Sequence, residues 1–373
     1  MAERSVGALS APLAGVRVID FTRLLPGAFA TLMLAELGAE VIKIDDPRDG
    51  DPLRHLPPRI NGRGSYYQLL GRGKKSVAVD LRDAAARPAL DRLLGTADVV
   101  VESFRPGTAR RLGVSGEAMR ARWPRMVHCA ITGYGQTGPY AELPGHDLNY
   151  VSVSGLLAAD RPTLTSLPRM FMADVGGGAM SAVIGLLAAL FARERTGEGA
   201  TIDISMHDAA LYWVMLPAAR ELVEGGLAAV DELPTFGGHA CYNVYRTRDG
   251  ESIALGALEP KFWIAFCRAV GRADLEPRHL TAPEDQAGLV AEIAAIFASR
   301  TRDEWLAFFA PYDVCVSPVN SPRQALADPH IAARGVVVDA PGLRAIRPPF
   351  LRQAPDLAPA PDVGQHTAEI LGA

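Results

Sequence analysis

The sequence has few cysteines, and none of them falls in a recognisable pairing or metal-binding motif. Only four occur in 373 residues, at Cys129, Cys241, Cys267 and Cys315, and no two form a CxxC pair. This spacing argues against a disulfide framework and against a zinc site. Reduced thiols are typical of cytosolic proteins, so we expect a cytoplasmic location and no structural metal.

An excess of positive charge is also missing. The formal net charge is −4, and 49% of the residues are hydrophobic and 21% charged, which is typical of a soluble globular protein. Because nucleic-acid-binding proteins carry a strongly basic surface, nucleic acid is not the expected partner.

Long hydrophobic runs are scarce as well. The first 15 residues lack the charged start and apolar stretch of a signal peptide. The most apolar run, Ala179 to Ala192, has about 14 residues, fewer than the roughly 20 needed to span a bilayer. It predicts a buried helix, and we expect no membrane association.

Nucleotide-binding fingerprints are absent too. LGRGKKS at 70–76 lacks the spacing of a phosphate-binding P-loop, and no GxGxxG follows the first predicted strand. What remains is a set of basic side chains near predicted strand ends: Arg72, Lys74, Lys75, Arg82, Arg105, Arg110 and Arg111. Solvated surface charge is the simplest explanation. The strand-end positions favour an anionic ligand instead, and a phosphate-bearing ligand without nucleotide fingerprints fits a coenzyme A (CoA) thioester.

The first 225 residues alternate between apolar runs and helical patterns. Strands are predicted at 16–21, 40–45, 76–81, 97–103, 125–133 and 201–206. Helices are predicted at 28–38, around 91–94, at 176–194 and at 207–224. This alternation predicts an α/β fold with a doubly wound, Rossmann-like parallel sheet that binds ligands at the carboxyl ends of its strands.

The composition changes after Gly225, where a polar, Gly- and Pro-containing passage runs to residue 238. A hairpin pattern turning at Asp249-Gly250 and two helical patterns, 260–271 and 284–299, follow. We therefore expect a smaller α+β domain over 235–320. The large domain then spans 1–225 and is completed by a Pro-rich segment, 325–373.

Three side chains are placed where acid/base chemistry would use them: His146 in GHDLNY, Asp174 in ADVGGG and Glu259 in GALEP. A histidine and a carboxylate that face one another can remove a proton and return it on the opposite face. Each also has a structural explanation. A single histidine is more often structural than catalytic, Asp174 suits a helix N-cap, and Glu259 precedes a proline that starts a helix.

These segments together resemble a known family. LAGVRVIDFTRLLPGAFATLMLAELGAEVIKID, LGRGKKSVAVDLR, ESFRPG, ITGYGQTGP, GHDLNY and ADVGGG are similar to the family III CoA transferases, the CaiB/BaiF superfamily. Within that superfamily the chain is most similar to the α-methylacyl-CoA racemase branch. The similarity runs from about residue 13 to 213 and resumes at GALEP.

The resemblance implies a homodimer of interlocked, ring-like protomers, with the active site between the large domain of one chain and the small domain of the other. It implies catalytic roles for His146 and Asp174 and a supporting role for Glu259, which would come from the other subunit. With the basic cluster, it implies substrate contacts by Arg72, Lys74, Val79, Asp80, Leu81, Arg82, Ser103, Phe104, Arg105, Arg111, Gly145, Asp147, Asn149, Tyr150, Ala173, Gly176, Gly177 and Gly178.

Two details of this implied site are the glycines after Asp174 and the acidic residue at position 46. The three glycines after Asp174 are expected to let the backbone approach the thioester, because glycine has no Cβ. Where the family has an arginine before a proline, this chain has Asp46. An acid cannot pair with a CoA phosphate, so Arg48 or Arg54 is expected to supply that contact, or the contact is lost.

The predicted function is a racemase that inverts the α-carbon of 2-methylacyl-CoA thioesters by two-base proton transfer through an enolate. CoA is part of the substrate, and no further cofactor is expected. One alternative is a CoA transferase of the same fold, in which Asp174 is a nucleophile. A second is a non-catalytic acyl-CoA-binding protein. Because the transferases typically lack the histidine, His146 favours the racemase.

Overall fold

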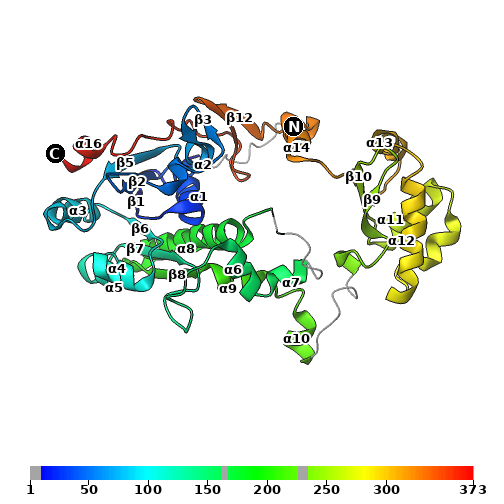
Figure 1. The fold of residues 1–373 in the computed structure, drawn as a ribbon, viewed down its shortest axis with the longest axis horizontal. Coiled ribbons are helices and arrows are strands. Elements are labelled where there is room, and N and C mark those ends of the chain that lie inside the picture. Colours follow the sequence, from blue (N-terminus) through cyan, green and yellow to red (C-terminus); the bar gives the residue numbers. More distant parts are fainter. Residues whose placement is uncertain (1–9, 161–166, 168, 226–233, 373) are drawn as a thin grey trace. The chain divides into compact units, whose positions relative to one another are not determined.

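The computed structural model describes residues 10–160, 167, 169–225 and 234–372, and it divides into two units (Figure 1). The first unit extends to Met215 and includes the segment from His330 onward, and the second comprises Leu216–Pro329. The sequence placed the corresponding divisions near residues 225 and 325. The polar passage predicted between the domains lies mostly outside the described residues.

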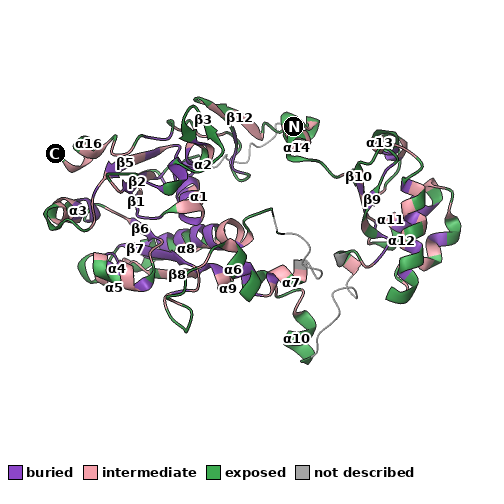
Figure 2. Ribbon diagram, viewed as in Figure 1, coloured by how far each residue is buried: buried purple, intermediate pink, exposed green. Residues whose placement is uncertain are grey.

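The first unit is built on a six-stranded sheet with the order β5-β2-β1-β6-β7-β8, in which every pair is parallel. Its strands are β1 Arg17–Asp20, β2 Glu40–Asp45, β5 Lys74–Ala78, β6 Val99–Glu102, β7 Val127–Thr132 and β8 Thr201–Ser205. Numbered along the chain, this is the order 3-2-1-4-5-6 of doubly wound nucleotide-binding sheets. The predicted central parallel sheet is confirmed by this pairing. Five of its strands are largely buried, while the edge strand β8 is partly exposed (Figure 2).

Helices cover both faces of this sheet (Figure 1). They are α1 Leu24–Glu36, α2 Ser65–Leu70, α3 Arg87–Leu94, α4 Pro106–Leu112, α5 Gly116–Arg122, α6 Asp147–Val153, α7 Leu156–Asp160, α8 Met180–Thr196 and α9 Met206–Trp213. A short hairpin, β3 Arg59–Ile60 with β4 Arg63–Gly64, and several 3-10 turns complete this part of the unit.

Three element boundaries differ from the sequence prediction. Helix α1 begins at Leu24, before Pro26, because a proline in the first turn has no helical N–H bond to lose. Strand β5 ends at Ala78 rather than 81, where the Asp80 carboxylate accepts the backbone N–H of Arg82 and forms a turn. The helix predicted over 207–224 is broken at Pro217 into α9 and α10 Ala219–Glu224.

The helix that carries Asp174 is longer than the apolar run suggested. A π-helical turn, Met172–Ala179, leads directly into α8, so the continuous helix covers Met172–Thr196. Its 25 residues are long and apolar enough to cross a membrane by length and composition alone, a test that core helices of soluble proteins also pass. One side of α8 packs into the core through residues such as Leu186, while Ile184 and Phe191 are exposed.

The second unit contains a three-stranded antiparallel sheet of order β11-β10-β9. Its elements are β9 Tyr242–Arg246, β10 Ser252–Gly256, α11 Pro260–Ala269, α12 Pro283–Phe297, α13 Arg302–Phe309, β11 Val316–Pro318 and α14 Pro322–Leu326, with short 3-10 turns between them. The predicted hairpin is present, with Gly250 at φ +80° in its turn. An aromatic core that includes Trp263, Phe266 and Phe297 holds the helices to the sheet.

After the second unit the chain returns to the first. Helix α15 Pro329–Ala333 and the hairpin of β12 Val337–Ala340 and β13 Leu343–Ile346 come first, and α16 Thr367–Leu371 ends the described chain. This end lies along strand β5, where His366 Nδ1 accepts the Ser76 N–H at 3.1 Å and Thr367 Oγ1 accepts the Ala78 N–H at 2.9 Å. The C-terminal segment thus covers the edge of the parallel sheet.

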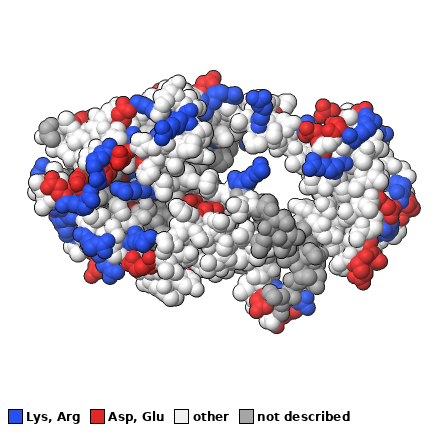
Figure 3. Space-filling model, in the orientation of Figure 1, with Lys and Arg blue, Asp and Glu red and all other residues white. Residues whose placement is uncertain are grey.

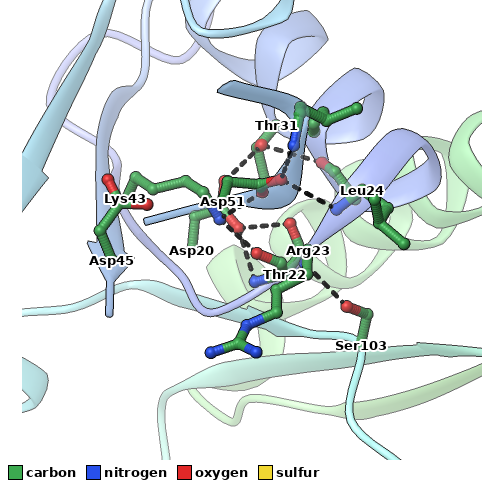
Figure 4. A network of polar contacts seen from close by, with 12 residues as sticks. Asp20, Thr22, Arg23, Leu24, Thr31, Lys43, Asp45, Asp51 and Ser103 are labelled. Atoms are coloured by element: carbon green, nitrogen blue, oxygen red, sulfur yellow. Dashed lines mark hydrogen bonds and ion pairs between the residues drawn. The ribbon is translucent and has the colours of Figure 1, made fainter. Parts of the chain in front are cut away.

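A buried network of charged side chains holds the turn between β1 and α1 (Figure 4). Lys43 lies 3.2 Å from the Asp51 carboxylate and also donates to the Thr22 carbonyl. Asp20 accepts both the N–H and the hydroxyl of Thr22, at 2.8 and 2.6 Å. Burial alone would raise the pKa of Asp20, but Lys43 and Lys74 outweigh it and lower that pKa. The network therefore remains charged and fixes residues 22–24.

We expect Lys43→Met to lower the free energy of unfolding by about 3–5 kcal/mol, because it leaves buried carboxylates without a counter-ion. Urea denaturation measures the change. The matched control is Lys75→Met on neighbouring strand β5. Its side chain is about a third exposed, and its ammonium pairs with Glu40 and Glu369, so a loss of about 0–1 kcal/mol is expected. Equal losses for the two variants would contradict this account of the network.

Candidate active site

Three adjoining cavities open at the carboxyl end of the parallel sheet. The basic cavity, about 670 Å³, is lined by residues that include Arg23, Arg48, Arg82 and Arg111 together with Asp45, Asp46, Val79, Asp80, Leu81 and Phe104. The central cavity, about 580 Å³, is lined by residues that include Arg23, Leu24, Ser103, Phe104, Arg105, Gly145, His146, Asn149, Tyr150 and Asp174. The apolar cavity, about 490 Å³, is lined by Leu24, Leu25, Leu53, Leu56, Leu148, Val151, Met170 and Phe171, and also by His146, Asp147 and Asp174.

The position of these cavities follows from the strand order. The chain reverses its winding direction between β1 and β6, and the residues that leave these two strands, Arg23 and Phe104, line both the basic and the central cavity. Ligands of doubly wound sheets bind at this crossover point, outside the carboxyl ends of the strands. The central and apolar cavities in turn share Leu24, His146 and Asp174. The three cavities therefore adjoin one another along this edge of the sheet.

Asp147 connects the two predicted catalytic residues. It is the first residue of α6, directly after His146, and its Oδ1 accepts the backbone N–H groups of Ala173 and Asp174, each at 2.8 Å. These donors belong to the first turn of the π-helix, whose N–H groups have no intrahelical partner. The carboxylate of Asp147 thus caps one helix while it begins another. The link brings His146 and Asp174 to the same two cavities.

The loop before His146 is also fixed. The His146 N–H donates to Asn149 Oδ1 at 3.0 Å, as in a capping box, and the Tyr150 hydroxyl donates to the Gly145 carbonyl at 2.6 Å. Tyr150 is buried and packs edge-to-face on Tyr134, with ring centroids 5.2 Å apart. Asn149 and Tyr150, predicted as substrate contacts, therefore line the central cavity and also position the histidine loop.

The pKa of Asp174 is unusually high for an aspartate. Burial, and secondarily the charge of Asp147, raise its pKa to about 7. A carboxyl with a pKa near neutrality can both hold and release a proton under ordinary conditions, which is what general acid–base catalysis requires. It lies on a π-helical turn, a geometry that is often found at functional sites.

In the basic cavity, two of the four arginines are paired with carboxylates. Arg48 forms two hydrogen bonds to Asp46, at 3.0 and 2.8 Å, and Arg82 bonds Asp80 at 3.2 Å. These bonds hold the pKa of Asp46 well below its usual range. The remaining cations, Arg23 and Arg111, leave an excess of positive charge that suits phosphate groups. On the face of the molecule drawn in Figure 3, acidic and basic side chains are interspersed.

Arg48 and Arg54, the two arginines expected to compensate for Asp46, lie in different surroundings. Arg54 is buried and bonds Asp45 at 2.6 Å and the Pro361 carbonyl at 2.8 Å, so its guanidinium is committed inside the unit. Arg48 lies on the basic cavity, braced by Asp46. Of the two expected substitutes, only Arg48 is placed at the cavity.

The structure does not bring Arg72 and Lys74 to this site, contrary to expectation. Lys74 begins β5, at the opposite end of the strand from the cavity, and its buried ammonium bonds the Thr31 hydroxyl at 2.7 Å and the Ala28 carbonyl at 3.0 Å. Burial lowers its pKa to about 8. Arg72 is likewise buried and pairs with Glu36 at 3.2 Å. Both cations stabilise the interior of the unit.

The residues around Asp174 also have another role than the one expected. Ala173 is fully buried, and the glycines that follow are packed against helix α9. A Cβ at Gly176 would lie 2.4 Å from the Trp213 ring, and one at Gly178 would lie 2.7 Å from Met206. These glycines are required by the close contact between the two helices, so the expectation that they admit a thioester is not supported.

Glu259 belongs to the second unit, where it immediately precedes α11. Its side chain is exposed and makes no capping hydrogen bond, while its carbonyl accepts the N–H groups of Phe262 and Trp263. The structural explanation, that it starts a helix, therefore holds for its backbone. A catalytic role for its carboxylate stays a prediction.

Several cavity residues were not predicted. Arg23 and Leu24 follow β1, as expected of ligand-binding residues, and lie inside the first segment that carries the family resemblance, but the sequence analysis did not single them out. Met170, Phe171 and Arg169 line the apolar cavity just before the ADVGGG segment. In the part of the chain that the structure describes, no three His, Cys, Asp or Glu side chains cluster as a metal site would require.

Comparison with known proteins places the chain in a family. The sequence matches CoA-transferase family III over residues 13–367. The chain belongs to this family. It is 33% identical over 371 residues to an α-methylacyl-CoA racemase of Mus musculus, covering 96% of this chain and 92% of the racemase. It is also 33% identical over 391 residues to a probable fatty acyl-CoA transferase of Mycobacterium tuberculosis, with coverage of 96% and 97%.

A crystal structure of a CaiB/BaiF family protein from Brucella suis agrees with the fold of this family III chain. Its TM-score is 0.82 at 28% sequence identity, over 97% of this chain and 98% of that one. The family predicted from the sequence motifs is confirmed. Racemases and transferases both occur among the relatives, so the assignment of a reaction depends on the residues of the site.

Asp147→Asn tests the coupling between the two carboxylates. The amide oxygen still accepts N–H bonds, but the negative charge that helps to raise the pKa of Asp174 is gone. We expect the limb of the pH profile of kcat/KM that reports Asp174 to move from about 7 toward lower pH, while burial keeps it above an ordinary aspartate. An unchanged limb in a correctly folded variant would contradict the proposed influence of Asp147.

Proposed function

We propose that this protein is a racemase that inverts the α-carbon of 2-methylacyl-CoA thioesters. The observation that carries the proposal is that His146 and Asp174, from different helices, line both the central cavity and the apolar cavity. A thioester in the central cavity with its acyl chain in the apolar cavity places the α-carbon between these two groups. The basic cavity then receives the phosphates of CoA.

The reaction follows from the acid/base properties of this pair. The His146 imidazole removes the α-proton, and the electrons of the C–H bond move to the carbonyl oxygen to give an enolate. The Asp174 carboxyl donates its proton to the opposite face of the α-carbon as the carbonyl re-forms. This leaves an imidazolium and a carboxylate, which exchange protons with solvent before the next turnover. The reverse reaction uses the same groups with their roles exchanged, and no further cofactor is needed.

CoA transfer is the second candidate, supported by the transferases among the relatives. In that reaction the Asp174 carboxylate attacks the thioester carbonyl, the CoA thiolate leaves, and a mixed anhydride forms. With a pKa of about 7, Asp174 is present in both protonation forms near neutral pH, so its acidity suits either reaction. The presence of His146 in the same cavity favours the racemase, because only that reaction needs a second proton-transferring group.

We expect an (R)-2-methylacyl-CoA incubated in deuterated water to gain deuterium at the α-carbon and to yield the S epimer. Mass spectrometry and chiral chromatography measure the two changes. His146→Ala should reduce inversion by about 10²–10⁴-fold, the usual contribution of a general base. Proton exchange should survive only for the epimer whose α-proton faces Asp174. CoA passing to an added carboxylic acid without any exchange would establish the transferase instead.

We further propose a homodimer in which Glu259 of one chain supports His146 of the other. The proposal draws on the family resemblance and on exposed apolar side chains of the first unit, such as Ile184, Phe191 and Tyr212, which are suited to a subunit contact. A carboxylate beside the imidazole would orient the ring and stabilise its charged form.

Co-expression of His146→Ala chains with Glu259→Ala chains tests this arrangement. If each site takes His146 from one chain and Glu259 from the other, one of the two sites in a mixed dimer is intact. About half of the wild-type activity per mixed dimer is then expected, after purification with two different affinity tags. If both residues came from the same chain, both sites would be damaged, and mixed dimers would be as inactive as the parent variants.

A further inference from the structure

Leu24 lines both the central and the apolar cavity. Among the described residues, only Leu24, His146 and Asp174 line both the central and the apolar cavity. The other two are the proposed acid/base pair. Under the proposed function, the thioester spans these cavities, and the residues shared by both are the two proton-transferring groups and one apolar residue, Leu24.

The backbone of Leu24 is held in an unfavourable conformation. Its φ is +62°, in the left-handed region that residues with a Cβ avoid. Ala11 and Asn61 are the other non-glycine residues with positive φ in the described chain, and neither lines one of the three cavities. Such strain is maintained only where the surrounding structure fixes it, and it is often found at ligand sites.

The surroundings do fix it (Figure 4). The Leu24 N–H donates to Asp51 Oδ1 at 3.3 Å, and the preceding Arg23 N–H donates to Ser103 Oγ at 2.9 Å. The same Asp51 pairs with buried Lys43, which also binds the Thr22 carbonyl. The buried charge network therefore holds the turn in a conformation that a leucine would not adopt by itself, and residue 24 of this turn lines both cavities.

We propose that Leu24 determines which substituent is accepted on the α-carbon. This inference rests on the proposed function and deepens it. The isobutyl side chain fills the junction of the two cavities, which leaves room for a methyl group at the α-carbon and excludes larger groups. The substrate class is then the 2-methylacyl thioesters rather than 2-substituted acyl thioesters in general. An added methylene in an apolar site changes relative rates by roughly 10–200-fold, so a single side chain suffices for this selection.

Leu24→Gly provides the test, because glycine adopts φ +62° without strain and the variant should fold. We expect wild type to exchange the α-proton of a 2-methylacyl-CoA much faster than that of the 2-ethyl analogue. In Leu24→Gly the kcat/KM for the 2-methyl substrate divided by that for the 2-ethyl substrate should fall by at least about tenfold. Leu24→Ala should give an intermediate ratio. Circular dichroism and thermal unfolding verify that both variants are folded.

Asn61→Gly is the matched control. It relieves a left-handed backbone at φ +52° on the exposed β3–β4 turn without altering a cavity, so the ratio should stay at the wild-type value. An unchanged ratio in folded Leu24→Gly overturns the proposal for Leu24, as does an equal change in Asn61→Gly. If wild type exchanges no α-proton but transfers CoA, the racemase proposal fails by itself. The 2-methyl and 2-ethyl acids are then compared as CoA acceptors, and the same ratio decides the role of Leu24.

Discussion

The site depends on the two hydrogen bonds that Asp147 accepts from the backbone of Ala173 and Asp174. Each is 2.8 Å long, and together they join the start of α6 to the π-helical turn before α8. His146 precedes Asp147 directly, so one carboxylate fixes the separation of the two elements that carry the acid/base pair. The same negative charge adds to the burial that raises the pKa of Asp174. Asp147 therefore contributes to both the geometry and the acidity of the site, although burial is the larger cause of the raised pKa.

The raised pKa of Asp174 lowers the stability of the folded protein at neutral pH. The pKa of Asp174 in the folded protein is about 7, above the ordinary value of 3.8 that applies to the unfolded chain. Between these values the folded state binds the proton more tightly, so the contribution of Asp174 to stability falls as the pH rises from about 4 to about 7. The strained backbone of Leu24 is a second local cost at the same site. The buried ion pair of Lys43 and Asp51 holds that turn in place.

The sequence predicted the sheet because parallel strands buried on both faces appear as continuous apolar runs. The cavity residues came from two sources: basic side chains such as Arg105 from their position at predicted strand ends, and residues such as Ser103 and Tyr150 from the family resemblance of their motifs. Lys74 was misjudged because a pattern of charges does not reveal which cations are buried against internal partners. Gly176 was misjudged because the neighbour that requires it, Trp213, comes from a helix whose packing the sequence does not specify.

The central claim is that two different groups serve the two faces of one α-carbon, and the origin of the hydrogen in the product tests it most directly. A 2-methylacyl-CoA of one configuration is mixed with enzyme in deuterated water, and the inverted product is analysed at the earliest measurable conversion. If His146 removes the proton and Asp174 delivers another, every inverted molecule carries deuterium from the first turnover. Inverted product that retains its original hydrogen would show that a single group performs both transfers, and the account would then be wrong.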